Sequence, residues 1–275
     1  MSDGISTALA QLRPALRDTT QNLETMRRVV GEHADADLVV FPELFLSGYT
    51  TSKLEELALD LDGSEVDTVA RLAMENSTAV IFGAPERVSG EIANSSICVD
   101  RAGNIAGSYR KAHLFGDEQD AFAAGAELLV VDLEGVKAGL MICFDVEFPE
   151  VARSLAKAGA NLLVTVSANM DPFGRDHDVF AIARALENGV PHLYVNQVGR
   201  GEAFTFAGGT MIVSADGDRL AEVGTAKERV IRCQLNPFAR SVERPEDLRP
   251  DYLKEMRGTL PVVTAERARG DSRTA

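Results

Sequence analysis

The most constraining feature of the sequence is a repeated alternation of short apolar segments with helix-like segments. The runs Asp37–Phe41, Val136–Ile142 and Asn161–Ser167 have the length and apolar content of buried strands. Between such runs, the sequence predicts helices over Lys53–Leu61, Ser64–Asn76 and Asp176–Asn188, and the last two carry apolar residues at helical spacing. Strands that alternate with helices form sheets whose faces the helices cover, so the sequence predicts an α/β fold.

Two other stretches contain strands joined by tight turns. The first lies within residues 95–109 and the second within residues 203–235. This order of alternation and hairpins, repeated once, predicts a four-layer αββα sandwich, with two sheets face to face and helices outside. No linker rich in Gly, Ser or Pro divides residues 1–260, which are therefore expected to form one domain. Residues 261–275 have few apolar anchors and are a candidate disordered tail.

Charge and cysteine content argue against several classes of function. The net charge of -14 repels phosphate backbones and anionic lipids, so neither nucleic acid nor membrane is an expected partner. Cys98, Cys143 and Cys233 are widely spaced and form no CxxC pair, which disfavours a disulfide framework and a cysteine zinc site. The sequence has no long apolar run or basic leader, and a cytoplasmic location is expected. Without an HExxH, P-loop or GxGxxG motif, no metal and no cofactor is predicted.

Cys143 ends the apolar run Ala138–Ile142, and a helical pattern with Pro149 near its first turn begins soon afterwards. A thiol at such a corner lies near the unpaired N–H groups that open a helix. Their partial positive charge favours the thiolate, so Cys143 is a candidate nucleophile. The alternative is that Cys143 is only a small buried apolar side chain.

Two more charged residues occur at strand ends. Glu43 follows the run LVVFP, and Lys111 ends the last strand of the first hairpin. If they meet Cys143, the three side chains supply a base, an electrophile and a nucleophile. Each charge could instead be an ordinary solvated residue. A Cys–His hydrolase would require His113 or His177 beside the thiol, although His113 is better explained as ordering the Lys111 loop.

Three segments carry a family resemblance: FPELFLSGY around Glu43, YRKAHLF around Lys111 and GLMICFDVEFPE around Cys143. In this order they resemble the nitrilase superfamily of carbon–nitrogen hydrolases, which use a Glu-Lys-Cys triad. The resemblance implies that Glu43 is the general base and acid, Lys111 the oxyanion stabiliser and Cys143 the nucleophile. Glu118 falls where many members carry a second glutamate that positions the substrate. The family's pairing of sandwiches implies a homodimer or larger homo-oligomer, with residues 236–260 as a tail on the partner.

The segments YRKAHLFGDEQ, CFDVEFPE and SANM look most like the branch that hydrolyses short aliphatic amides, including 5-aminopentanamide. The expected reaction converts a small aliphatic primary amide, including an ω-amino amide, to an acid and ammonia through a cysteine thioester. The alternatives are an N-carbamoyl amine hydrolase, a nitrilase, and a catalytically idle binding protein on the same fold. Five residues are candidates for the substrate pocket or the oxyanion hole: Tyr49, Phe144, Glu147, Asn169 and Met170. Asn169 could equally tie down a turn, and Met170 could equally fill the core.

Overall fold

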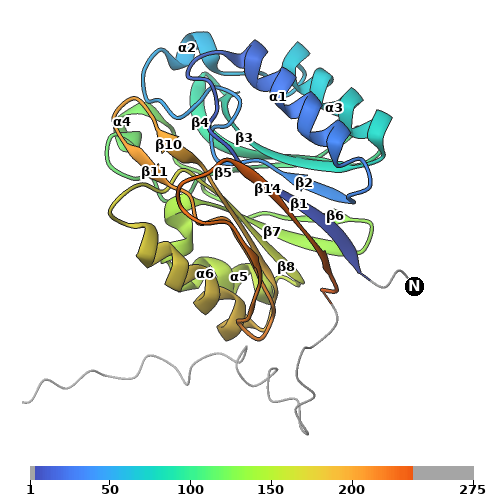
Figure 1. The fold of residues 1–275 in the computed structure, drawn as a ribbon. Coiled ribbons are helices and arrows are strands. Elements are labelled where there is room, and N and C mark those ends of the chain that lie inside the picture. The colour runs from blue at the N-terminus through green and yellow to red at the C-terminus, as the bar shows by residue number, and fades with distance from the viewer. Residues whose placement is uncertain (1–3, 238–275) are drawn as a thin grey trace, which may run out of the picture.

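Two six-stranded sheets pack face to face in the computed structural model of the protein, which describes residues 4–237 (Figure 1). The strand order is β14-β1-β2-β3-β4-β5 in the first sheet and β13-β12-β9-β8-β7-β6 in the second. Strands β1, β2 and β3 run parallel, and so do β7, β8 and β9. Helices cover the outer face of each sheet. The predicted αββα sandwich is therefore confirmed.

The strands of each sheet come from two separate parts of the chain. The first sheet consists of β1 (Ile5–Gln11), β2 (Leu38–Val40), β3 (Ala79–Val88), β4 (Glu91–Val99), β5 (Ile105–Arg110) and β14 (Arg229–Leu235). The second consists of β6 (Val130–Leu133), β7 (Val136–Ile142), β8 (Leu162–Ser167), β9 (His192–Asn196), β12 (Met211–Val213) and β13 (Arg219–Glu222). A separate small ribbon pairs β10 (Val198–Arg200) with β11 (Thr205–Ala207).

In the described part of the chain, four longer helices form the outer layers. Helices α1 (Thr19–Glu32) and α3 (Ser64–Asn76) lie on the first sheet, and α5 (Pro149–Lys157) and α6 (Gly174–Asn188) lie on the second (Figure 1). Three shorter elements are α2 (Leu54–Leu57), α4 (Glu118–Ala121) and the 3₁₀ helix η1 (Cys143–Glu147).

The predicted helix over Lys53–Leu61 is wrong for most of its length. Only Leu54–Leu57 is helical. Beyond it, the Leu59 N–H donates to the Pro85 carbonyl at 3.0 Å, and the Leu59 carbonyl accepts from Arg87 at 2.8 Å. Pairing with the end of β3 satisfies this backbone in an extended form, so tertiary contacts override the local helical pattern.

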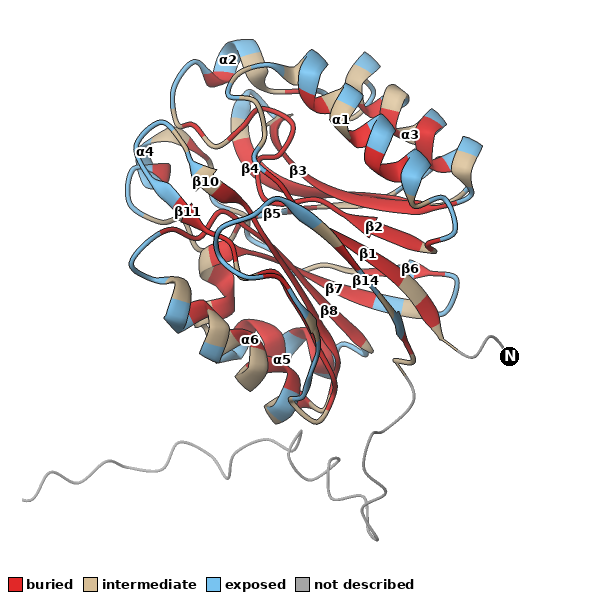
Figure 2. Cartoon of the chain, viewed as in Figure 1, coloured by how far each residue is buried: buried red, intermediate tan, exposed pale blue. Residues whose placement is uncertain are grey.

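The core occupies three layers. Figure 2 shows buried residues along both sheets and on the inward faces of the helices, with exposed residues on the outer helix faces. Leu9, Ile81, Leu140 and Val164 are among the fully or almost fully buried side chains that pack between the sheets. Their burial fixes the sheets against each other, which brings strand ends from the two sheets to one site.

Some predictions concern residues beyond this part of the chain. The tail predictions for residues 236–260 and 261–275 fall, from residue 238 onward, outside the described residues. The single domain and the homo-oligomer therefore stay predictions. Within residues 4–237, no helix has the length and apolar content that a membrane span requires.

Candidate active site

Glu43 lies in a tight loop directly after β2. Leu44 has a φ of 47°, and the loop backbone lies against Gly83 of β3. A Cβ at Gly83 would come within 2.3 Å of the Leu44 nitrogen and 2.6 Å of the Glu43 Cα. Only glycine allows this close approach, which turns the Glu43 side chain into the molecule. Glu43 is fully buried as a result.

The Glu43 carboxylate accepts hydrogen bonds from both sheets. Its Oε1 accepts from Lys111 Nζ at 2.7 Å and from Asn94 Nδ2 at 2.7 Å. Its Oε2 accepts from the Ala168 N–H, just after β8, at 2.8 Å. Gln197 Nε2 also donates to the Glu43 backbone carbonyl at 2.7 Å. The carboxylate is thus held in one orientation at the junction of the two sheets. Asn94 was not among the site residues predicted from the sequence.

Lys111 lies between two buried carboxylates. Its Nζ is 2.7 Å from Glu43 Oε1, 2.9 Å from Glu118 Oε1 and 2.7 Å from Glu118 Oε2. Glu118 also accepts from the Tyr49 hydroxyl at 3.0 Å and from the Phe115 N–H at 2.9 Å. The structure therefore brings four of the predicted residues together: Glu43, Tyr49, Lys111 and Glu118.

Burial changes the ionisation of this cluster. Burial raises the pKa of the Glu43 carboxyl above its ordinary value, although the neighbouring Lys111 acts in the opposite direction. Burial alone would lower the pKa of Lys111, but the carboxylates of Glu43 and Glu118 outweigh it and raise that pKa well above its ordinary value. Lys111 is consequently a permanent cation, whereas Glu43 is a carboxyl that can exchange a proton nearer neutral pH.

Cys143 begins η1 at a strained corner. Its φ is 43°, in the left-handed region that non-glycine residues rarely adopt. Asp145 holds this corner, because its Oδ2 accepts from the Ile142 N–H at 3.0 Å and from the Tyr109 hydroxyl at 2.8 Å. Its Oδ1 accepts from the His113 N–H at 3.1 Å. Asp145 is thus a site residue that sequence reasoning missed, and His113 does order the segment after Lys111.

The predicted preference of Cys143 for the thiolate is wrong in this resting site. Burial raises the pKa of the Cys143 thiol, and the negative charge of Glu43 raises it further. Lys111 and the Ser167 hydroxyl lower the pKa, but by less. The helix that follows is a short 3₁₀ turn, so its few N–H groups do not offset burial. The thiol consequently needs a base before it can attack, and the charges of Glu43, Lys111 and Glu118 act on it.

The other four residues predicted for the substrate pocket or the oxyanion hole lie in different environments. The Phe144 N–H lies in the first turn of η1, where a 3₁₀ helix provides no internal acceptor. Asn169 ties down a turn, since its Oδ1 accepts from the Met170 N–H and its Nδ2 donates to the Phe173 carbonyl. Met170 packs in a cluster with Phe206. Glu147 faces His177, at 3.3 Å between Oε1 and Nε2.

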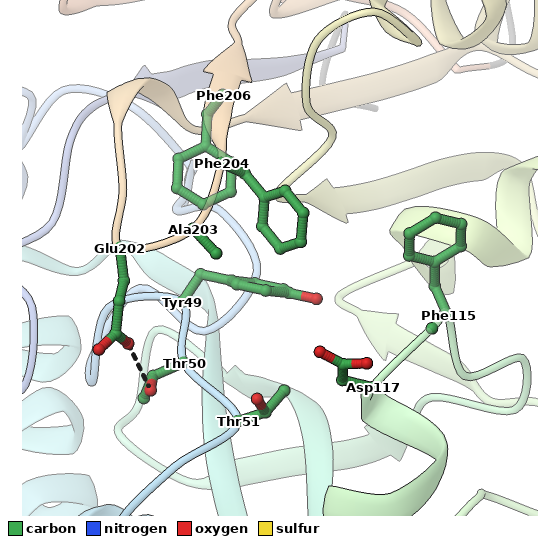
Figure 3. A pocket seen from close by; sticks show the side chains of 10 residues that line it. Tyr49, Thr50, Thr51, Phe115, Asp117, Glu202, Ala203, Phe204 and Phe206 are labelled. Carbon is green, nitrogen blue, oxygen red and sulfur yellow. Dashed lines mark hydrogen bonds between the residues drawn. The ribbon is translucent and has the colours of Figure 1, made fainter.

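An aromatic pocket of about 140 Å³ adjoins the carboxylate cluster through Tyr49. Figure 3 shows Tyr49, Phe115 and Phe204 around it, with the Asp117 carboxylate directed toward the space beside the Tyr49 hydroxyl. Glu202 also lines the pocket, but it is already paired with Arg17 at 2.8 Å. Fold and site together define an α/β-sandwich protein with a thiol, a carboxyl and an ammonium group at one buried point.

Comparison with known proteins identifies the family. The model of the carbon-nitrogen hydrolase family matches residues 6–242. A (R)-stereoselective amidase from a Pseudomonas species is 37% identical over 253 residues, which cover 90% of each chain. The chain belongs to the carbon–nitrogen hydrolase family. It is a member of the nitrilase superfamily, as the resemblance implied. It is a hydrolase of amide C–N bonds, so the alternative of an idle binding protein is set aside.

Solved structures agree with this assignment. A glutamate-to-glutamine mutant of the amidase from Nesterenkonia sp. AN1, with the acetamide moiety of fluoroacetamide covalently added at its active site cysteine, has a TM-score of 0.80 and 26% identity. This match covers 94% of the present chain and 95% of the amidase. A cysteine-to-alanine mutant of the Nesterenkonia amidase, in complex with butyramide, has a TM-score of 0.80 and 25% identity, covering 93% of this chain and 95% of that one.

Proposed function

We propose that the protein hydrolyses a small aliphatic primary amide to the carboxylic acid and ammonia through a thioester on Cys143. The observation that carries this proposal is the buried Glu43–Lys111 pair, at 2.7 Å, acting on a neutral thiol. Glu43 removes the thiol proton, and the sulfur attacks the amide carbon. Proton transfer by a placed group of this kind contributes about 10²–10⁴-fold to the rate.

Attack on the amide places negative charge on the carbonyl oxygen. Lys111 and the Phe144 N–H stabilise this oxyanion, since one is a fixed cation and the other an N–H without a helical acceptor. Glu43 then gives its proton to the departing nitrogen, and the C–N bond breaks to leave ammonia and the thioester. Glu43 next takes a proton from water, whose oxygen attacks the thioester. Release of the acid returns the proton to the sulfur. Glu118 keeps Lys111 in place through both of its oxygens.

The pocket beside Tyr49 supports the finer proposal of a short acyl chain that ends in an amine. Its volume of 140 Å³ is below the range of about 300–1,000 Å³ that is usual for drug-sized ligands. Aromatic faces attract an ammonium group, and the Asp117 carboxylate adds an opposite charge at the same place. An ω-amino amide such as 5-aminopentanamide would thus put its amide at Cys143 and its ammonium near Asp117.

The test is an ammonia-release assay on matched compounds. 5-Aminopentanamide is compared with hexanamide, which has a methyl group where the amine stands, and with an N-carbamoyl amine and a nitrile of similar length. We expect the amides to react and 5-aminopentanamide to have the highest kcat/KM. Asp117→Asn should reduce that preference over hexanamide by about 10-fold, the scale of one charge contact. Exclusive turnover of the carbamoyl amine or the nitrile would instead establish one of the alternative reactions.

A further inference from the structure

A chain of hydrogen bonds leads from Cys143 away from the carboxylate cluster. The Ser167 hydroxyl, at the end of β8, is a hydrogen-bond partner of the Cys143 sulfur. Ser167 Oγ lies 3.1 Å from the Tyr194 hydroxyl on β9, which lies 2.8 Å from His177 Nδ1 on α6. His177 Nε2 lies 3.3 Å from Glu147 Oε1. We call Ser167, Tyr194, His177 and Glu147 the hydroxyl chain.

The hydroxyl chain is built into the interior and reaches the surface at one end. The exposed fraction is 0% for Ser167, 1% for Tyr194 and 2% for His177, whereas the Glu147 side chain is 32% exposed. Its members come from four elements, η1, β8, α6 and β9, so no single local motif accounts for it. Buried polar groups are costly unless they are satisfied, and here each buried group has a partner at both ends.

The number of protons restricts how Ser167 can be arranged. Its oxygen already accepts from the Asn169 N–H at 3.1 Å. A hydroxyl has one donor and two acceptor positions, so one donor and one acceptor remain for Cys143 and Tyr194. Ser167 therefore either accepts from the thiol and donates to Tyr194, or accepts from Tyr194 and donates to the sulfur. The first arrangement suits a neutral thiol and the second suits a thiolate.

The direction of the hydrogen bond between Ser167 and Tyr194 also determines which nitrogens of His177 carry a proton. In the first arrangement Tyr194 donates to Nδ1, so His177 is neutral and its Nε2–H faces Glu147. In the second, Tyr194 donates to Ser167 and must accept from Nδ1–H. Because the carboxylate of Glu147 also takes a proton donor, His177 is then an imidazolium paired with Glu147. The state of the sulfur and the state of this pair are consequently linked through two rotating hydroxyls.

We propose that the hydroxyl chain is a set of positioning residues that stabilise the Cys143 thiolate by reversing its hydrogen bonds, an inference that rests on the proposed nucleophilic role of Cys143. The proton balance is simple. The thiol proton goes to Glu43, the hydroxyls of Ser167 and Tyr194 rotate, and His177 takes one proton from solvent beside Glu147. The charged or titratable groups that face His177 are Glu147 from η1 and Tyr194 from β9.

Arg184, two turns beyond His177 on α6, influences the hydroxyl chain without being a member of it. Its guanidinium donates to the backbone carbonyls of Val146 and Glu147 at 2.9 and 3.0 Å, which fixes the end of η1. Its side chain also pairs with Glu187 at 3.0 Å. The Glu147 carboxylate faces His177. Its negative charge would stabilise an imidazolium at that position.

The experiment measures the reactivity of Cys143 directly. The full-length protein is alkylated with iodoacetamide from pH 5 to pH 10, and the peptide that contains Cys143 is quantified by mass. The partly exposed Cys233 serves as an internal reference thiol. We expect Tyr194→Phe to slow alkylation of Cys143 by about 10-fold at pH 7, the worth of one hydrogen bond to a charged group, and to move the profile to higher pH. Glu147→Gln should move it in the same direction by less, and kcat should fall with KM unchanged in both.

His192→Gln is the matched control. His192 is also buried on β9, but its Nε2 faces Thr165 Oγ1 at 2.7 Å and its Nδ1 faces the Ala181 carbonyl at 2.9 Å. Burial lowers its pKa to about 4, so it stays neutral, and the control should leave the Cys143 profile in place.

The outcomes separate the inference from the proposed function. Profiles of Tyr194→Phe and Glu147→Gln that superimpose on the wild-type profile would overturn the hydroxyl chain even if the enzyme hydrolyses amides. Glu147→Gln changes a partly exposed charge at constant shape, so it keeps the test valid if Tyr194→Phe folds poorly. Loss of the proposed function appears separately, as a wild-type protein that releases no ammonia from any amide, while the alkylation profiles still decide the role of the chain.

Discussion

The two sheets contribute different chemistry to the space between them. The first sheet brings groups that are ionised or easily ionised, Glu43 after β2 and Lys111 after β5, already in contact at 2.7 Å. The second sheet brings groups that are neutral at rest, the Cys143 thiol after β7 and the hydroxyls of Ser167 and Tyr194. In the proposed mechanism, the reaction therefore begins with a proton that crosses from the second sheet to the first.

Replacing Cys143 tests the contribution of the second sheet and should have the largest effect on turnover. Cys143→Ala is expected to reduce turnover to background, a loss of at least about 10⁴-fold, because no other group can form the thioester. Ammonia release measures this. Cys98→Ala is the matched control, since Cys98 is also buried but lies inside β4 in the core, with a pKa raised to about 12 by burial. Turnover retained by Cys143→Ala would remove the thiol from the mechanism.

Replacing Lys111 tests the contribution of the first sheet. Lys111→Met should lower kcat by about 10²–10³-fold, through loss of an oxyanion donor. It should also reduce the free energy of unfolding by about 3–5 kcal/mol at pH 7, because two buried carboxylates lose their partner. Burial raises the pKa of Glu43, and loss of Lys111 removes the charge that opposes this rise. The protonated form of Glu43 therefore favours the folded state at low pH, and this stability is lost as pH rises through the folded pKa.

Denaturant unfolding at several pH values checks this second prediction. The deficit of Lys111→Met relative to wild type should be small near pH 4 and grow toward pH 7. Lys137→Met, at an exposed position on β7, is the control and should change stability by no more than about 0.5 kcal/mol. A deficit that does not vary with pH would mean that the carboxylates carry no unbalanced charge in the variant.

The same division between the sheets explains what the sequence could and could not reveal. Glu43, Lys111 and Cys143 each follow a recognisable strand, so their positions at strand ends were predictable, and family resemblance supplied their roles. Asn94 was not, because β4 begins at Glu91, four residues before the strand that the pattern indicated. The error over the thiolate has a physical cause as well, since the pKa of Cys143 depends on burial and on Glu43, 100 residues away in the chain.

A smaller effect is expected at Asp145, which connects the two sheets. Asp145 fixes the Cys143 corner and is hydrogen-bonded to Tyr109 of β5. Asp145→Asn puts an amide NH₂ where one oxygen accepted, so one of the present donors loses its partner. We expect a loss of about 1–3 kcal/mol in the free energy of unfolding and about 10-fold in kcat. Asp132→Asn is the control, because Asp132 caps an exposed turn through the Gly135 N–H. Equal effects of the two variants on kcat would show that Asp145 has no special influence on the thiol.

The mildest test changes no residue and follows kcat/KM with pH. The base must be deprotonated to accept the thiol proton, so activity should fall as pH falls through the pKa of Glu43. Burial raises that pKa, which places the acidic limb above pH 4.5, the ordinary value for a glutamate. Lys111 stays protonated over the same range because its pKa is also raised, so it adds no limb of its own. Glu43→Gln should lose this limb together with most of the activity. A wild-type limb at or below pH 4.5 would mean that the proton crosses to some group other than Glu43, and the division of chemistry between the sheets would then need another acceptor.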